Sequence, residues 1–216
     1  LAPYFGQYYL TVIIADIVAA IILPKIPPLS KKPNTYYTGE KKDAGENIPE
    51  GYTNASWGTY LAVKKAEESG NVKNFVKNGT QTVLDMWMGV MPVIMAFGTI
   101  ALIVAETTPI FQWLGVPFIP ILKLLRIPNA VEASQTMIVG FADMFLPSVI
   151  GASIPNEMTR FVIAAVSVTQ LVYLSEVGAV ILGSKIPVNF KDLFIIFLER
   201  TLITLPIVAL AAHIIF

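Results

Sequence analysis

The feature that most constrains this chain is a series of long apolar runs that carry few charged side chains. The run Met86–Ala105 holds twenty residues without a charge, and Tyr4–Leu23, Glu157–Leu182 and Lys191–Phe216 are also apolar over most of their length. A helix needs about 20 apolar residues to cross the hydrocarbon core of a bilayer. A transmembrane barrel would instead show short segments of alternating hydrophobicity. The sequence therefore predicts an all-α fold, a polytopic membrane helix bundle.

The composition supports this fold class and excludes several others. Hydrophobic residues make up 55% of the 216 residues and charged residues 14%, whereas a soluble domain is about 25% charged. The fifteen basic and fifteen acidic residues cancel, so no net charge attracts polyanions and no nucleic-acid partner is expected. There is no cysteine, which excludes a disulfide framework and a thiolate metal site. We expect no cofactor and no bound metal.

Charged residues gather in one segment near the N-terminus. The stretch Lys25–Lys77 holds nine lysines and six acidic residues, half of all charged side chains, together with several Pro and Gly turn signals. We predict a transmembrane helix over residues 1–23, a charged loop over 24–82 and a membrane domain over 83–216. Within the loop, Ser56–Ser69 has the spacing of a short amphipathic helix, which fits either a solvated helix near the membrane surface or a partner-docking helix.

The distribution of basic residues predicts the orientation. Cytoplasmic loops carry an excess of Lys and Arg, so we expect the lysine-rich loop to be cytoplasmic. The count of basic residues fits best if Thr107–Ile127 crosses the membrane, giving six spans. The alternative is a segment that enters and returns, because Pro109, Pro117 and Pro120 suit a broken helix. The chain begins at Leu1, so we also expect it to be a piece of a longer protein.

Four acidic residues lie well inside apolar runs: Asp16, Asp143, Glu176 and Glu199. Each costs about 3 kcal/mol near the centre of a spanning helix, so an intramembrane acid is a candidate functional group by default. Asp16 suits a hydrogen bond to a neighbouring helix. Glu199 and Arg200 point about 100° apart on a helix, which favours a structural ion pair or an interface anchor with other residues. His213, the single histidine, is expected at the membrane edge.

Asp143 is a candidate cation or proton site. Pro147 follows it by four residues, and a proline inside a helix removes one donor and clashes with the carbonyl four residues back. Free backbone oxygens beside a carboxylate suit a cation. The alternative is a kink stabilised by internal polar contacts.

Asn156 and Glu157 mark a predicted helix start. Asn is a good N-cap residue, and an acidic residue suits the first helical turn. At membrane depth such a start would offer free N–H groups to a solute, as in the half-helices of transporters. At the surface it would be a capped loop.

The remaining polar cluster has the most specific spacing. Gln170, Tyr173 and Glu176 follow a three-residue step, and Ser175 adds a hydroxyl. On a continuous helix the first three would share one face, where they could bind a polar solute. The alternative is a polar seam between helices. Gly178 permits a helix break nearby.

The segment Val83–Phe216 resembles the nucleoside-recognition Gate-domain membrane proteins, in particular their YjiH-like branch. The resemblance rests on Met86–Pro92, Thr107–Gly115, Gly140–Pro147 and Thr169–Gly178. It implies a transporter-like bundle with broken or re-entrant helices, and a longer chain that contains two such repeats. It also implies that the solute binds at helix breaks, where Gln170, Ser175 and Glu176 match best and Asn156 and Glu157 more loosely.

The sequence thus predicts a multi-pass protein of the inner (plasma) membrane, a secondary transporter or permease of a small polar, nucleoside-like solute. Na⁺ or proton coupling is expected at Asp143, and the N-terminal repeat or a second copy would complete the protein. The alternative is a non-transporting membrane partner or assembly protein that docks through the lysine-rich loop. No enzyme activity is expected, because the acidic residues are scattered rather than convergent.

Overall fold

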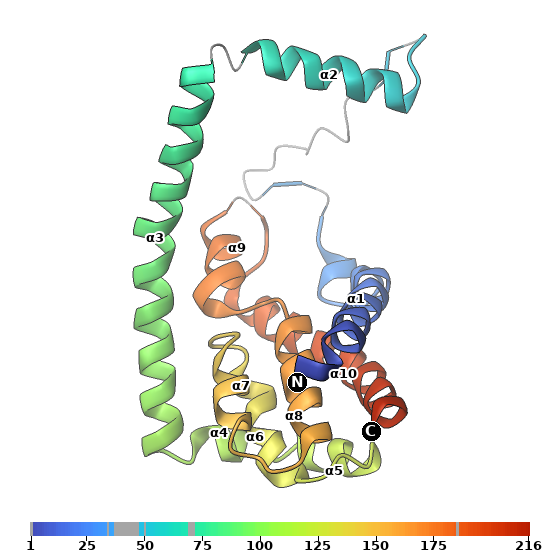
Figure 1. Ribbon diagram of the computed structural model, residues 1–216, viewed down its shortest axis with the longest axis vertical. Helices are drawn as coiled ribbons and strands as arrows, with labels where there is room; N and C mark the ends of the chain where they lie inside the picture. Colours follow the sequence, from blue (N-terminus) through green and yellow to red (C-terminus); the bar gives the residue numbers. More distant parts are fainter. Residues whose placement is uncertain (1, 34, 37–47, 50, 69–71, 185) are drawn as a thin grey trace. The chain divides into compact units, whose positions relative to one another are not determined.

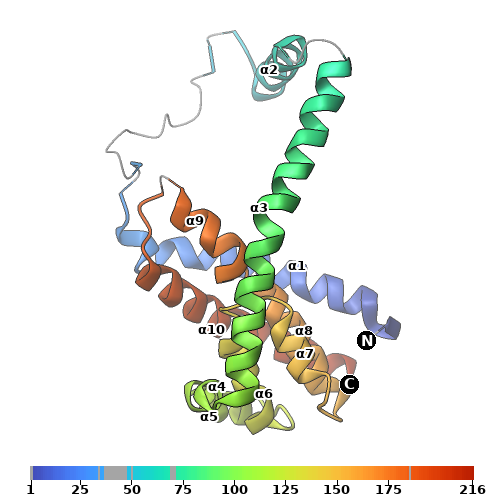
Figure 2. The ribbon, with the colours of Figure 1, turned by 90° about the vertical axis from the view of Figure 1, so that its left-hand side faces the viewer.

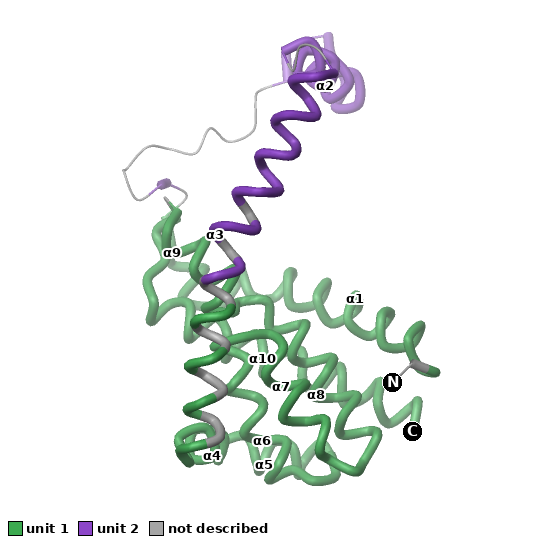
Figure 3. The backbone as a smooth tube through the Cα atoms, turned by 60° about the vertical axis from the view of Figure 1, so that its left-hand side comes forward, with its two compact units in different colours: residues 1–33, 93–216 green, residues 34–92 purple. Residues whose placement is uncertain are grey.

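The computed structural model describes residues 2–33, 35–36, 48–49, 51–68, 72–184 and 186–216 (Figure 1). Residues 37–47 and 69–71 of the predicted charged loop, and Leu1, lie outside the described residues. The chain divides into two compact units, one formed by residues 1–33 with 93–216 and the other by 34–92 (Figure 3). Every regular element in the described part is a helix.

The second unit contains α2 (Asn54–Glu68) and the first part of α3 (Val72–Thr107). The sequence predicted an amphipathic helix over Ser56–Ser69, close to the bounds of α2. The ring of Tyr52, just before α2, packs with those of Trp57 and Tyr60 on α2, and Trp57 and Tyr60 are stacked at 5.2 Å between centroids. Helix α3 begins eleven residues before Val83, because Val72, Phe75, Val76 and Gly79 already follow a helical spacing.

The first unit contains the remaining elements. These are α1 (Phe5–Ile22), α4 (Ile110–Gly115), α5 (Phe118–Leu124), α6 (Ala130–Val139), α7 (Leu146–Gly151), α8 (Glu157–Thr169), α9 (Ala179–Gly183) and α10 (Phe190–Ile215). Short 3₁₀ turns lie at Ala2–Tyr4, Leu23–Lys25 and Leu29–Lys31, and a π-helical turn, η4, lies at Leu174–Gly178. Helix α8 packs against both α7 and α10, and Figure 2 shows where these three helices lie within the unit.

Three helical stretches in the described residues are long and apolar enough to cross a membrane. They are Phe5–Lys31, Glu157–Gly183 and Phe190–Ile215. Helix α10 alone has 26 residues, which corresponds to about 39 Å and exceeds the hydrocarbon core of about 30 Å. The outward side chains of α1 are large and apolar, with Tyr9 60%, Leu10 58% and Ile17 55% exposed. A contiguous apolar face of this kind suits lipid rather than water.

Helices α1, α8 and α10 pack against one another and form the centre of the unit. Their contact surfaces combine small residues, such as Ala15 and Ala212, with large ones, such as Phe161, all fully buried. Small residues let helix backbones approach closely, which is how helices associate within a membrane, where lipid already solvates apolar side chains.

The stretch Thr107–Ile127 differs from a continuous crossing. It forms the short helices α4 and α5, of six and seven residues, and neither is long enough to cross a bilayer by itself. Pro109 and Pro117 precede them as cap residues, because proline fits the start of a helix and not its interior. Gly115 ends α4 against α6, where an added Cβ would lie 2.7 Å from the Ser134 carbonyl oxygen. The structure thus shows the broken helix that the three prolines favour, in place of one continuous helix.

Candidate solute and ion site

The Glu157–Gly183 span is interrupted near its middle, directly after α8. Helix α8 ends at Thr169, Leu171 adopts a left-handed conformation at φ 54°, and Tyr173 is extended. The chain then turns into η4, where the Gly178 amide donates to the Tyr173 carbonyl at 2.6 Å. An added Cβ on Gly178 would lie 2.7 Å from that same carbonyl oxygen, so this π-turn requires glycine.

The second break lies between α6 and α7. Helix α6 ends at Val139 and α7 begins at Leu146, with Pro147 in its first turn. Between them the Asp143 carboxylate accepts a hydrogen bond from the Phe145 amide at 2.7 Å. We expected Pro147 to lie inside a continuous helix, which is wrong, because α6 ends before it and Pro147 lies in the first turn of α7. The Asp143 amide still donates to the Val139 carbonyl at 3.4 Å, so the last helical turn of α6 extends to this residue.

The two breaks meet. The Leu174 amide donates to the Phe141 carbonyl at 2.8 Å, and the Ser175 amide donates to the Ala142 carbonyl at 3.2 Å. The Ser175 hydroxyl lies 3.2 Å from the Asp143 carboxylate. Both side chains are almost completely buried, with Asp143 3% and Ser175 1% exposed. The structure thus brings together two predicted site residues that are 32 positions apart in the sequence.

Gln170 connects the end of α8 to two other helices. Its side-chain nitrogen donates to the Met137 carbonyl at 2.8 Å and to the Thr201 hydroxyl of α10 at 3.0 Å. Its side-chain oxygen is buried and has no hydrogen-bond partner in the described part of the chain. Gly140 makes room for this oxygen, since a Cβ there would lie 2.0 Å from it. A buried amide oxygen without a partner is costly and is a natural point for a donor group to bind.

Tyr173 and Glu176 lie at the same break, but their side chains have different surroundings. The Tyr173 hydroxyl donates back to the Ser167 and Val168 carbonyls at 2.8 and 2.6 Å, so it stabilises the end of α8. Glu176 is partly exposed and lies close enough to Asp143 for the two carboxylate charges to interact. The expectation that Gln170, Tyr173 and Glu176 share one helical face is wrong, because the chain is not helical between Gln170 and Tyr173.

An ion pair between Arg200, which is buried, and Asp16, which is partly exposed, lies at the end of α8. Arg200 of α10 donates to the Thr169 carbonyl at the end of α8 and to the Asp16 carboxylate of α1, the latter at 2.5 Å. Arg200 is 7% exposed. From the sequence we expected partners elsewhere for Arg200 and a hydrogen bond to another helix for Asp16, and the structure joins these two groups. The Thr169 carbonyl, which no sequence pattern singled out, completes the network.

Glu199 precedes Arg200 and has a different environment. One of its carboxylate oxygens is buried and has no hydrogen-bond partner among the described residues. Its neighbours on the same stripe of α10 are Ile195 and Leu202, which are 44% and 47% exposed. Glu199 therefore points away from Arg200, as the 100° rotation between adjacent helical residues requires.

Asn156 and Glu157 lie at the opposite end of α8. The thirteen residues of α8 separate Asn156 from Gln170, a distance of roughly 20 Å. The Asn156 side chain accepts from the Thr159 amide at 2.9 Å, which confirms the predicted N-cap. Glu157 pairs with Arg160 at 3.6 Å and is 60% exposed at its side chain. The structure does not bring these two residues together with the breaks.

This position gives a first prediction. Asn156→Ala removes the cap, and we expect the free energy of unfolding to fall by about 1 kcal/mol, with no change in solute binding at the breaks. Thermal unfolding of the full-length protein measures the first effect and ligand stabilisation measures the second. Asn156→Asp, which preserves the accepting oxygen, is the control and should retain stability. A loss of ligand response in Asn156→Ala would contradict the assignment of Asn156 as a cap.

Comparisons with known proteins give one relative and no function. A protein of Alkalihalophilus pseudofirmus that is described as uncharacterized is 55% identical over 212 residues, covering 98% of this chain and 46% of that protein. The chain thus spans about half the length of this curated relative. No family model matches the chain, and no solved structure matches it. The geometry of the two breaks is therefore the observation that bears on function.

Proposed function

We propose that this chain is part of a multi-pass inner-membrane secondary transporter or permease that moves a small polar solute. The site is the point where the α6–α7 break meets the break between α8 and η4. The observation that carries the proposal is the contact of Asp143 with Ser175 at 3.2 Å between two interrupted helices. No enzyme activity is part of this proposal.

Two interrupted helices and a buried carboxylate are costly inside a membrane. Irregular backbone within the membrane is tolerated only where it is buried in protein or lines a cavity, and an intramembrane carboxylate is costly. A purely structural bundle would avoid both. In transporters, interrupted helices supply free backbone groups to solutes and ions near the middle of the membrane. The break after α8 falls near the middle of the Glu157–Gly183 span.

The groups at the breaks have complementary roles in this proposal. The free Gln170 oxygen, the Ser175 hydroxyl and the Glu176 carboxylate bind solute hydroxyl or amide groups. Asp143 binds the coupling cation or proton, because its carboxylate is buried where the two breaks meet and its charge has no basic partner among the described residues. Tyr173 supports the site from behind through its hydrogen bonds to α8. The resemblance to Gate-domain proteins supports a nucleoside-like solute and a second repeat in the full-length protein.

The experiment is ligand stabilisation of the full-length protein in detergent. Nucleosides, amino acids and Na⁺ are tested over a range of pH, and a ligand at 100 times its dissociation constant adds about 2.7 kcal/mol of apparent stability. We expect a solute response that Glu176→Gln weakens and a cation response that Asp143→Asn removes. Glu132→Gln is the matched control, because Glu132 is exposed on α6.

Two outcomes would contradict the proposal. One is a solute response that survives unchanged in both Glu176→Gln and Asp143→Asn. The other is a folded protein that responds to no solute or cation in the panel. The second outcome would favour a membrane partner that docks through the lysine-rich segment, and deletion of residues 31–73 should then abolish its complex.

A further inference from the structure

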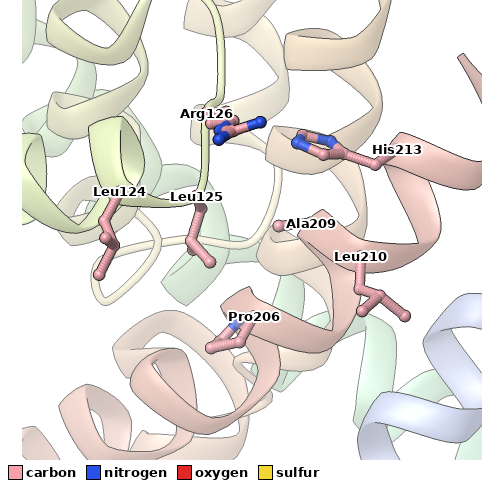
Figure 4. A pocket seen from close by; sticks show the side chains of 7 residues that line it. All are labelled: Leu124, Leu125, Arg126, Pro206, Ala209, Leu210 and His213. Atoms are coloured by element: carbon pink, nitrogen blue, oxygen red, sulfur yellow. The ribbon is translucent and has the colours of Figure 1, made fainter.

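A groove lies between α5 and the last part of α10, away from the two breaks. It has a volume of about 400 Å³ and its lining residues are Leu124, Leu125, Arg126, Pro206, Ala209, Leu210 and His213. Figure 4 shows that Arg126 and His213 lie at one side of the groove with their nitrogen-bearing ends turned toward each other. The rest of the lining is apolar.

The polar side of the groove has an unbalanced positive character. No acidic residue lines the groove, and neither Arg126 nor His213 forms an ion pair with any residue that the structure describes. Arginine presents a planar fork of donors that fits phosphate oxygens, and histidine offers an N–H donor whether neutral or charged. Two such groups facing each other suit one shared anion.

The backbone at Arg126 directs the side chain at a conformational cost. Arg126 has a left-handed backbone at φ 53°, which is uncommon for a residue other than glycine. The turn connects the end of α5 to Ile127, whose amide donates to the Leu122 carbonyl at 2.9 Å. Glycine would fit this backbone better than arginine does, so the choice of arginine here points to a use for its side chain.

The depth of the groove in the membrane follows from α10. His213 lies two residues before the end of this 26-residue helix, and a helix of this length reaches both interfaces. Pro206 lies seven residues earlier, about 10 Å deeper in the hydrocarbon region. The groove therefore has a basic end at the interface and an apolar end among acyl chains. Leu210 and Leu124 extend the apolar surface, at 66% and 82% exposed.

We infer that this groove binds one anionic phospholipid. The lipid phosphate lies between Arg126 and His213, and one acyl chain follows the apolar wall past Leu125 and Leu210 toward Pro206. A free phosphate ion would use only the basic end and would leave the apolar wall without a ligand. Basic pockets beside spanning helices are a known way to bind anionic head groups. The inference is independent of the proposed transport function.

The test measures lipid selectivity of the full-length protein. The protein is reconstituted in phosphatidylcholine with increasing phosphatidylglycerol, and the retained lipids are quantified by native mass spectrometry. We expect preferential retention of phosphatidylglycerol. Arg126→Gly should weaken it about fivefold, the equivalent of about 1 kcal/mol for one basic residue near the membrane surface. His213→Phe, which retains an aromatic ring but no N–H donor, should also weaken it.

The controls separate this site from general surface charge and from folding. Lys123→Gln removes an exposed charge from α5 that does not line the groove, and it should leave retention nearly unchanged. Arg126→Gly relieves the left-handed backbone, so its thermal stability without added lipid should not fall. The inference is overturned by equal retention of the two lipids, by an equal loss in Lys123→Gln, or by inorganic phosphate alone stabilising the protein as well as phosphatidylglycerol does.

Discussion

Arg200→Met is expected to cost about 3 kcal/mol of unfolding free energy, because it removes two hydrogen bonds from a charged donor and leaves the partly buried Asp16 carboxylate unpaired. The Arg200 side chain joins the Asp16 carboxylate and the Thr169 carbonyl, so its loss leaves both acceptors without a partner. Methionine fills a similar volume, so the effect reports the lost hydrogen bonds and charge rather than a cavity. Thermal or denaturant unfolding of the full-length protein measures it.

A double variant separates the effect of the unpaired charge from the effect of losing the ion pair. Asp16→Leu combined with Arg200→Met removes both charges, and replacing a buried ion pair by apolar residues is often neutral or stabilising. We therefore expect the double variant to be more stable than Arg200→Met alone. Lys191→Met is the matched control, since Lys191 is exposed in the first turn of the same helix. If Lys191→Met and Arg200→Met lost similar stability, the buried network would not stabilise the bundle.

Gly140→Ala is expected to destabilise the protein by roughly 3 kcal/mol through overpacking and lost hydrogen bonds. The new methyl group would lie 2.0 Å from the Gln170 side-chain oxygen. The amide must therefore move, and it loses its bonds to the Met137 carbonyl and the Thr201 hydroxyl. Because both acceptors are buried, no water replaces the amide. Unfolding measurements on the full-length protein quantify this loss.

The Gln170 side chain, which the new methyl group would meet, can be removed by a separate substitution. In Gln170→Ala the oxygen is absent, so adding Gly140→Ala to that background should cost little more. Gly183→Ala is the matched control, because a Cβ there meets nothing within 4 Å. Additive losses in the Gly140→Ala and Gln170→Ala double variant would contradict the packing of Gln170 against Gly140, since contacting residues should be non-additive.

The sequence predicted the elements that depend on local chemistry. Apolar runs indicated spanning helices, and Asn156 indicated the start of α8 because Ser, Asp and Asn oxygens accept the free amides of a first turn. The prolines at 109 and 117 indicated an interruption, and the stretch forms the two short helices α4 and α5. Asp143 was singled out because a carboxylate in an apolar run needs compensation.

Other features depend on contacts between distant residues, which no local pattern contains. The Asp16–Arg200 pair joins residues 184 positions apart. The break after α8 contains no glycine or proline at its left-handed residue, Leu171, so the spacing of Gln170, Tyr173 and Glu176 suggested a continuous helix. The tertiary contacts of α8 with α10 and with the α6–α7 break override that periodicity.

The most direct test of the transport site is the water accessibility of Ser175. The chain has no cysteine of its own, so Ser175→Cys introduces one thiol at a position that is 1% exposed. A transport site must open to water during its cycle. We predict that a charged, membrane-impermeant thiol reagent labels Ser175→Cys in the full-length protein in membranes, whereas Val166→Cys, also 1% exposed, stays unlabelled. Equal resistance of both thiols in the folded protein would contradict a transport site where the two breaks meet.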